Sequence, residues 1–188
     1  MKDFLIALRL AAISVLVCAV AYPLTLAAFA SAAFPFTASG SILHDDAGNP
    51  IGSERIAQEF ASAGYFWPRP SAVDYNAAAT GGSNLSPTNP KIAERAIPIL
   101  VRLGASEQKP VPLDLVTASG SGVDPDITEA AALFQVPRIA SARNLTETDL
   151  HALIKRSSRL PGGFMAGGGR IVNVLNLNIE LDRLAAGK

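Results

Sequence analysis

The sequence predicts an α+β membrane protein with one N-terminal transmembrane helix followed by a single compact mixed α/β extracytoplasmic domain. Three observations predict this organisation: a long apolar run near the N-terminus, helix-like and strand-like patterns that alternate after it, and a single cysteine. Because Cys18 lies inside the apolar run, no disulfide can stabilise the domain. Its stability has to come from a hydrophobic core.

The apolar run covers residues 10–34, which carry no charge. A helix rises ~1.5 Å per residue, so this run exceeds the roughly 20 residues that cross a ~30 Å hydrocarbon layer. A cleaved secretory signal is the alternative, with Lys2 and Arg9 before the core and a small-x-small pattern at Ala30 and Ala32. Signal cores are typically about 7–15 residues long. The length therefore favours a retained helix.

Pro23 interrupts the hydrogen-bond pattern of this helix. Proline has no N–H, and its ring clashes with the carbonyl one turn earlier. In lipid the freed carbonyl needs a substitute partner, which a neighbouring helix, Thr25 or a local backbone adjustment would supply. We therefore expect a kink at Pro23.

Basic residues predict the orientation of the helix. Lys2 and Arg9 precede the run, whereas residues 35–44 contain neither Lys nor Arg. By the positive-inside rule, residues 1–9 form a cytoplasmic tail and residues 37–188 form the extracytoplasmic domain. The expected location is the cell (inner) membrane, as a single-pass protein.

The charge of the exported part excludes one class of function. Removing Lys2 and Arg9 from the 16 basic residues, and Asp3 from the 16 acidic ones, leaves one more acid than base. A nucleic-acid-binding domain carries an excess of Lys and Arg. We expect membrane lipid as a partner of the helix, and no nucleic acid as a partner of the domain.

The first half of the domain begins with a hairpin and a helix. Turn-forming residues at 45–49 join two short strands at 41–44 and 50–52. Ser53 can then cap a helix whose buried face includes Ala57 and Phe60, at helical spacing. Both elements are short.

A long loop and a further helix come next. Residues 64–90 are rich in Pro and Gly, which excludes a continuous helix or a central strand. Asn89 and Pro90 predict the start of a helix that runs through Val101. Pro98 inside this helix predicts a break or kink.

The second half of the domain contains two further helices. Asp124 and Pro125 predict a helix start that leads into residues 127–135. Pro137 then predicts a bend before a short helix over residues 138–143.

The C-terminal part of the domain is expected to close the core. Thr146 predicts the cap of a helix, with Asp149 three positions on. A Gly-rich turn at 162–169 follows, then a strand at 170–175. A closing helix ends the domain, with Leu177, Leu181 and Leu184 on its buried face.

The Gly- and Ser-rich loop at residues 119–122 is a candidate binding site. Successive backbone N–H groups in such a turn can hold an anion, and the alternative is a purely structural turn. The loop lacks the lysine of a P-loop. His44 and His151 have no metal-ligand spacing around them. We expect neither a metal site nor catalytic residues.

An aromatic cluster is the second candidate site. Tyr65, Phe66 and Trp67 precede Arg69, and exposed rings beside an arginine are common anchors in protein interfaces. Asn84, in the following polar turn, belongs to the same candidate interface. Packing of the rings in the core under the loop is the alternative, and the sequence leaves both open.

Three parts of the chain carry a family resemblance. The first combines the loop at residues 65–72 with the turn at 81–90. The second joins residues 116–125 to 135–140, and the third is residues 172–181. Together with the single N-terminal span, these stretches resemble the C subunit of the Kdp potassium-transporting ATPase over nearly the whole chain.

The resemblance implies a non-pore, non-phosphorylated subunit of a high-affinity, ATP-driven potassium uptake complex. Such a subunit is not an enzyme by itself. It stabilises assembly of the potassium-translocating subunit with the ATP-hydrolysing P-type subunit, and is described as raising the affinity of the pump for ATP. The resemblance implies no cofactor of its own, and ATP only through the complex.

The resemblance also implies a nucleotide contact. The residues that match it are Ser119, Gly120, Ser121, Gly122 and Gln135. The expected topology puts these residues on the side of the membrane away from cytoplasmic ATP. The two expectations therefore conflict.

Asp126 departs from the family pattern, since it stands where the family usually has a histidine. Any role that requires an imidazole at this position is in doubt. A different class of function remains as an alternative, namely a membrane-anchored exported enzyme or small-ligand-binding domain that uses the loop from Ser119 to Asp124.

Overall fold

The computed structural model describes residues 1–45, 47–162 and 169–187. It divides into two compact units, one ending at Ser53 and the other beginning at Glu54. The Gly-rich turn expected at 162–169 lies, except for its two end residues, outside the described residues. As predicted, the chain is a mixed helix-and-sheet protein with one apolar N-terminal helix.

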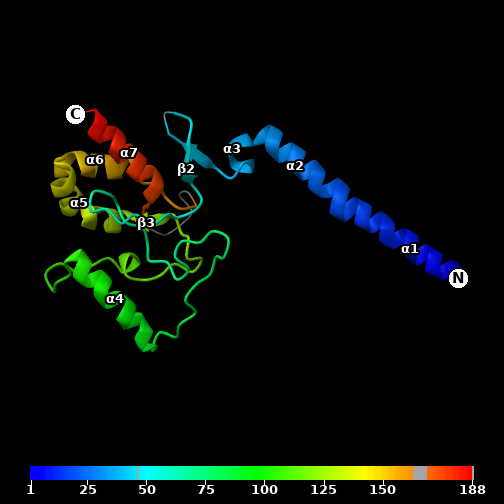
Figure 1. Cartoon of the computed structure of the whole chain (residues 1–188), viewed down its shortest axis with the longest axis horizontal. Coiled ribbons are helices and arrows are strands. Elements are labelled where there is room, and N and C mark those ends of the chain that lie inside the picture. Colours follow the sequence, from blue (N-terminus) through cyan, green and yellow to red (C-terminus); the bar gives the residue numbers. More distant parts are fainter. Residues whose placement is uncertain (46, 163–168, 188) are drawn as a thin grey trace. The chain divides into compact units, whose positions relative to one another are not determined.

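The N-terminal helix is long and apolar enough to cross a membrane. It runs over Lys2–Ala33, 32 residues with a mean hydropathy of 2.5 in its most apolar window. It consists of α1 (Lys2–Val15), a π-helical stretch η1 (Leu16–Ala21) and α2 (Tyr22–Ala33), drawn as one continuous helix in Figure 1. The helix begins before the uncharged run, so its first turns contain the charged residues Lys2, Asp3 and Arg9.

The π-helical stretch lies immediately before Pro23. The N–H of Tyr22 donates to the carbonyl of Val17, five residues back. The hydroxyl of Thr25 donates to the carbonyl of Ala21 at 2.8 Å. A π-turn is a known way to absorb an irregular residue within a helix. The local adjustment expected at Pro23 is thus present.

The predicted hairpin is confirmed. After the short helix α3 (Pro35–Ala38), strands β1 (Ile42–His44) and β2 (Pro50–Ser53) pair antiparallel, with Ile42 opposite Ser53. The Asp45 carboxylate accepts hydrogen bonds from the N–H groups of Ala47 and Asn49. These bonds hold the tight connection.

The prediction of a helix after Ser53 is wrong. Ser53 ends β2, and its hydroxyl donates to the carbonyl of Gly40 at 2.7 Å instead of capping a helix. The N–H of Ala57 donates to the carbonyl of Val123 at 2.9 Å. This long-range bond replaces a helical one, so residues 54–60 run as turns and coil beside a distant segment.

The loop and the helix that follows it are confirmed. Residues 64–89 contain no helix or strand. Helix α4 (Pro90–Leu103) begins where the side chain of Asn89 accepts a hydrogen bond from the N–H of Lys91. Pro98 does not end α4, because it and Glu94 are exposed, and water can satisfy the carbonyl that the proline leaves free.

The prediction that a helix starts at Asp124 and Pro125 is wrong. Strand β3 (Asp126–Thr128) occupies this position and pairs antiparallel with β4 (Ile171–Asn173). The helix begins later, where the Thr128 side chain accepts from the N–H of Ala131 at 3.1 Å.

The two helices expected around Pro137 are one helix, α5 (Glu129–Arg143). Pro137 and Leu133, one turn earlier, are both exposed. The carbonyl that Pro137 cannot bond therefore faces water, and the helix continues through the proline.

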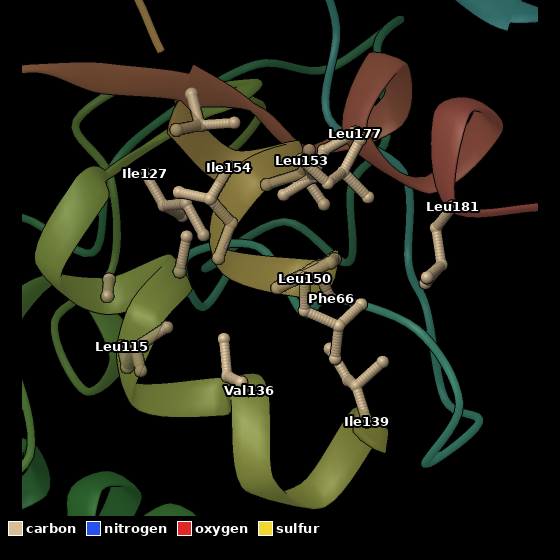
Figure 2. Close-up of a cluster of buried hydrophobic side chains, with 14 of the residues drawn as sticks. Phe66, Leu115, Ile127, Val136, Ile139, Leu150, Leu153, Ile154, Leu177 and Leu181 are labelled. Carbon is tan, nitrogen blue, oxygen red and sulfur yellow. The ribbon is translucent and has the colours of Figure 1, made fainter. Parts of the chain in front are cut away.

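The helices α5, α6 (Glu147–Ser157) and α7 (Val174–Ala186) enclose the core. Thr146 caps α6 as predicted, accepting from the N–H of Asp149 at 3.1 Å. β4 is shorter than the predicted strand because α7 already begins at Val174. In Figure 2, Phe66 from the long loop points into the same cluster as Leu150 of α6 and Leu177 of α7.

Candidate functional site

Two consecutive loop residues, Phe66 and Trp67, are held by buried amide side chains. The N–H of Phe66 donates to Oδ1 of Asn178 at 2.8 Å, and Nδ2 of Asn178 donates back to the Phe66 carbonyl at 3.0 Å. Gln135 does the same for Trp67, with distances of 2.8 and 3.2 Å. Each amide thus replaces a strand partner for backbone that has no secondary structure. We call Phe66 and Trp67 the amide-clamped segment.

Gln135 has no hydrogen-bonding capacity left. Besides the Trp67 N–H, its Oε1 accepts from Nη2 of Arg138 at 2.7 Å. Besides the Trp67 carbonyl, its Nε2 donates to the carbonyl of Ala131 at 3.3 Å. A neutral amide offers two donor hydrogens and two acceptor lone pairs. All four are used within the domain, where Gln135 is only 1% exposed.

The loop at residues 119–122 packs against the turn at Gly81 and Gly82. The N–H of Gly81 donates to the carbonyl of Ser121 at 2.8 Å. A Cβ on Gly82 would lie 2.9 Å from the carbonyl oxygen of Gly120. These glycines therefore permit close approach of two backbone segments.

Gly122 is the most constrained residue of this loop. Its φ is +71°, in the left-handed region. A Cβ there would lie 2.5 Å from Cγ2 of Val73. Ser119 is 3% exposed, and its N–H donates to the carbonyl of Pro70 at 3.2 Å. The positive φ and the close approach of Val73 explain why position 122 is a glycine.

Arg69 joins the two loops. Its Nη1 lies 3.1 Å from Oδ2 of Asp124, and its Nη2 donates to the carbonyl of Ala118 at 3.4 Å. The Tyr75 hydroxyl donates to the Arg69 carbonyl at 2.9 Å. Burial, with a smaller contribution from Glu59, raises the pKa of Tyr75 to about 12. Tyr75 therefore stays protonated and acts as a donor.

The predicted interface residues have different environments. Phe66 is 0% exposed and Trp67 is 6% exposed, so both rings are part of the core. Tyr65 is half-buried, and its hydroxyl donates to Asp182 at 3.0 Å. Asn84 is exposed, with a φ of 50°. The rings of Phe66 and Trp67 therefore pack inside the domain, which is the second of the two environments that the sequence left open.

A cavity of about 340 Å³ lies between α4 and the segment that follows Trp67. This size is within the range of small-ligand pockets. Its walls are mostly apolar and aromatic, with four charged residues. The lining residues are Glu59, Phe60, Trp67, Pro68, Pro70, Ser71, Asp74, Tyr75, Arg95, Pro98, Ile99, Arg102, Leu103 and Leu115.

Two arginines stack on Trp67 beside this cavity. The guanidinium carbon of Arg102 lies 3.9 Å from the centroid of the Trp67 ring, and that of Arg138 lies 3.6 Å from it. Such contacts are attractive because the face of an indole ring is electron-rich. Burial, and then the charge of Arg102, lowers the pKa of Arg138 to about 10. Positive charge is thus concentrated around one ring.

The residues of the implied nucleotide contact are not joined in the structure. Among the described residues, no hydrogen bond connects Gln135 to residues 119–122. The described part of the chain contains no group of three or more His, Cys, Asp or Glu residues that could hold a metal ion.

Sequence reasoning missed the roles of Asn178, Arg95, Arg102 and Arg138. Arg95 and Arg102 are seven residues apart, so a helix through them places both on one face, and this spacing could have been noticed. Asn178 follows Leu177 within the apolar pattern of α7. A polar residue at a buried helix position signals a specific hydrogen-bond partner.

Comparisons with known proteins agree over nearly the full length. The family model described as "K+-transporting ATPase, c chain" matches residues 4–183. A Potassium-transporting ATPase KdpC subunit from Parvibaculum lavamentivorans is 45% identical over 184 residues, covering 98% of each chain. Proteins of the same name from Burkholderia vietnamiensis and Pseudomonas putida are 46% and 44% identical, covering 93–95% of the chains.

Proposed function

The chain belongs to the KdpC family, the c chain of the K+-transporting ATPase, and we propose that in this pump it stabilises the assembly of the other subunits. As the c chain it is an accessory, membrane-associated subunit of potassium transport and is not itself catalytic. The proposed partners are the potassium-translocating subunit and the ATP-hydrolysing P-type subunit.

The proposal rests on one observation: the polar side chains around the amide-clamped segment form hydrogen bonds within the domain. Gln135 and Asn178 are buried, and the side-chain amide of each is hydrogen-bonded to the loop backbone. The ion pair between Arg69 and Asp124 ties one loop to another. A domain whose polar side chains maintain its own shape is suited to presenting a fixed surface to partner proteins.

A helix in the membrane and a domain outside the cytoplasm complete the proposal. The apolar helix over Lys2–Ala33 has no buried residue along its described length, so its whole surface is available to lipid or to helices of other subunits. Lys2 and Arg9 favour a cytoplasmic N-terminus in the inner membrane.

An effect on ATP, if the subunit exerts one, is proposed to act through the complex. Direct contact by Gln135 would require breaking its bonds to Trp67, Ala131 or Arg138. A buried amide that loses its partners costs about 1–3 kcal/mol per group. We therefore assign Gln135 to the fold and leave any rise in ATP affinity to subunit assembly.

Copurification tests the assembly role. The full chain, tagged at its C-terminus, is isolated with mild detergent from membranes that contain the whole pump. We expect both the potassium-translocating and the ATP-hydrolysing subunits to be retained, and to separate from each other when this chain is omitted. Unchanged association of the two subunits without this chain would contradict the proposal.

Protease digestion tests the topology. Protease added to intact spheroplasts should remove the domain after residue 36 and leave the helix in the membrane fraction. Protection of the domain would reverse the proposed orientation. A mature N-terminus near Ala33 would show that the helix is cleaved instead of retained.

A further inference from the structure

Arg95 is one of the residues that line the 340 Å³ cavity. Its Nε is buried and makes no hydrogen bond. Among the described residues, no acidic side chain forms an ion pair with Arg95, Arg102 or Arg138. Three guanidinium groups therefore gather around Trp67 and one wall of the cavity without a carboxylate bound to any of them.

The Nε of Arg95 is the buried atom of this group that lacks an acceptor, whereas Arg102 is exposed to water. A buried N–H without an acceptor is unfavourable, because neither water nor the protein satisfies it. The charge of Arg102 contributes, after burial, to the lowered pKa of Arg138, which shows that these two guanidinium groups lie close enough to repel each other. A carboxylate oxygen bound in the cavity would supply the acceptor that the Nε of Arg95 lacks and would offset the repulsion between the neighbouring guanidinium groups.

The charges that line the cavity set the size of that anion. Arg95 and Arg102 supply two positive charges, and Glu59 and Asp74 supply two negative ones. A polyphosphate with several charges would be repelled by the two acids. A single carboxylate can reach the arginines with less repulsion, and carboxylates match the planar fork of a guanidinium group.

The remaining walls suit an apolar side chain. Three aromatic rings line the cavity together with prolines and aliphatic residues, and α4 forms one wall. Helix α4, which the structure describes in full, has no buried residue of its own. Filling the cavity would bury the face of α4 that carries Ile99 and Leu103, and burial of apolar surface favours association.

We propose that this cavity binds an acidic side chain, together with an apolar side chain beside it, from an extracytoplasmic segment of another pump subunit. This inference rests on the proposed assembly function and deepens it, because it names the chemistry of the contact. Arg95 binds the carboxylate, and the aromatic and proline walls hold the apolar neighbour.

Zero-length crosslinking in the assembled pump tests the contact. The substitution Arg95→Lys places an amine in the cavity, and a water-soluble carbodiimide joins an amine only to a carboxylate that touches it. We expect mass spectrometry to find an amide bond between position 95 and an Asp or Glu of another subunit. The matched control is Val101→Lys on the same helix, because Val101 is 77% exposed and does not line the cavity.

The outcomes separate the contact from the assembly function. No crosslink at position 95, or a crosslink only to Glu59 or Asp74 of the same chain, overturns the cavity contact while copurification leaves the assembly role intact. An equal yield of the same intersubunit crosslink from the Val101→Lys control also overturns it. Absence of the other subunits from the wild-type preparation would contradict the assembly role itself.

A charge series gives an independent measurement. Arg95→Glu should reduce retention of the partner subunits at least about tenfold, since it places two like charges together. Arg95→Lys should retain most of the binding. Equal retention by both variants, with the same thermal unfolding as the wild type, would contradict the proposal.

Discussion

Trp67 and helix α4 line the same cavity, but they are attached to the domain in different ways. Trp67 and its neighbour Phe66 belong to an irregular loop, yet both are buried and their backbones are bonded to Gln135 and Asn178. Helix α4 is regular and well capped at Asn89, and none of its described residues is buried. Regular structure and firm attachment are thus separate properties.

This difference indicates where each kind of role belongs. The loop residues that are most distinctive in sequence use their polar contacts inside the domain. Helix α4 has no buried residue among those described, unlike α5, α6 and α7. It presents arginines that form no ion pair with the described acidic residues, and exposed apolar residues that include Ile97 and Val101. Partner contacts are therefore more readily expected at α4, and effects on folding at the amide-clamped segment.

The largest expected effect comes from removing an amide clamp. Asn178→Ala leaves the buried N–H and carbonyl of Phe66 without partners, so the free energy of unfolding should fall by about 3 kcal/mol. For a chain of this size the melting temperature falls by roughly 10 °C. Trp67 is the only tryptophan, so its fluorescence in the detergent-solubilised full chain reports unfolding beside the clamp.

Asn76→Ala is the matched control for this prediction. The Asn76 side chain also bonds loop backbone, accepting from the N–H of Ala78 at 3.0 Å, but it is exposed. Water can replace that bond, so the change should stay within about 0.5 kcal/mol. Equal effects of the two substitutions would show that burial of the Asn178 amide is not what holds the loop.

Gly122→Ala should have the next largest effect. A methyl group there would lie 2.5 Å from Val73 and would adopt a φ of +71°, which costs an L-residue about 1–2 kcal/mol before any clash. We expect a loss of roughly 2–3 kcal/mol, measured by chemical unfolding. In the control Gly120→Ala, the added Cβ meets no described atom within 4 Å, and comparable destabilisation there would refute the packing explanation.

A smaller, pH-dependent effect is expected at Asp126. Burial, despite the attraction of Arg159, raises the pKa of Asp126 above 3.8. The folded state therefore binds this proton more tightly than the unfolded state, and Asp126 lowers stability as the pH rises above about 4.

Asp126→Asn removes this ionisation. The stability of the variant relative to the wild type should rise between pH 4 and pH 7, and the difference should disappear below the unfolded pKa of about 3.9. Unfolding curves across this pH range measure it. A difference that does not change with pH, or one of opposite sign, would contradict the assignment.

The sequence predicted the elements whose signals are local. The Asn89 and Thr146 caps, the hairpin and the apolar helix depend on residues a few positions apart, and all are present. The errors came from distant partners. The N–H of Ala57 bonds the carbonyl of Val123 instead of continuing a helix. Strand β3, which begins at Asp126, pairs with β4 where a helix was predicted to start.

The candidate site was predictable only in part. The sequence identified Gln135 and the loop at 119–122 as distinctive, but it could not reveal that Gln135 bonds Trp67 at a separation of 68 residues. It also could not place Arg102 of α4 and Arg138 of α5 over one indole ring. Contacts across the fold determined these roles.

Titration of the purified full chain with ATP tests most directly the claim that Gln135 and the loop at 119–122 serve the fold. Calorimetry is done with the wild type and with Ser121→Ala. Unfolding of the variant is measured in parallel, because the Ser121 hydroxyl accepts a hydrogen bond from the N–H of Val123 at 3.2 Å. The account predicts no saturable binding up to millimolar ATP in either protein. Micromolar binding by the wild type that Ser121→Ala abolishes, with unchanged unfolding, would contradict the account and assign the loop at 119–122 to a nucleotide.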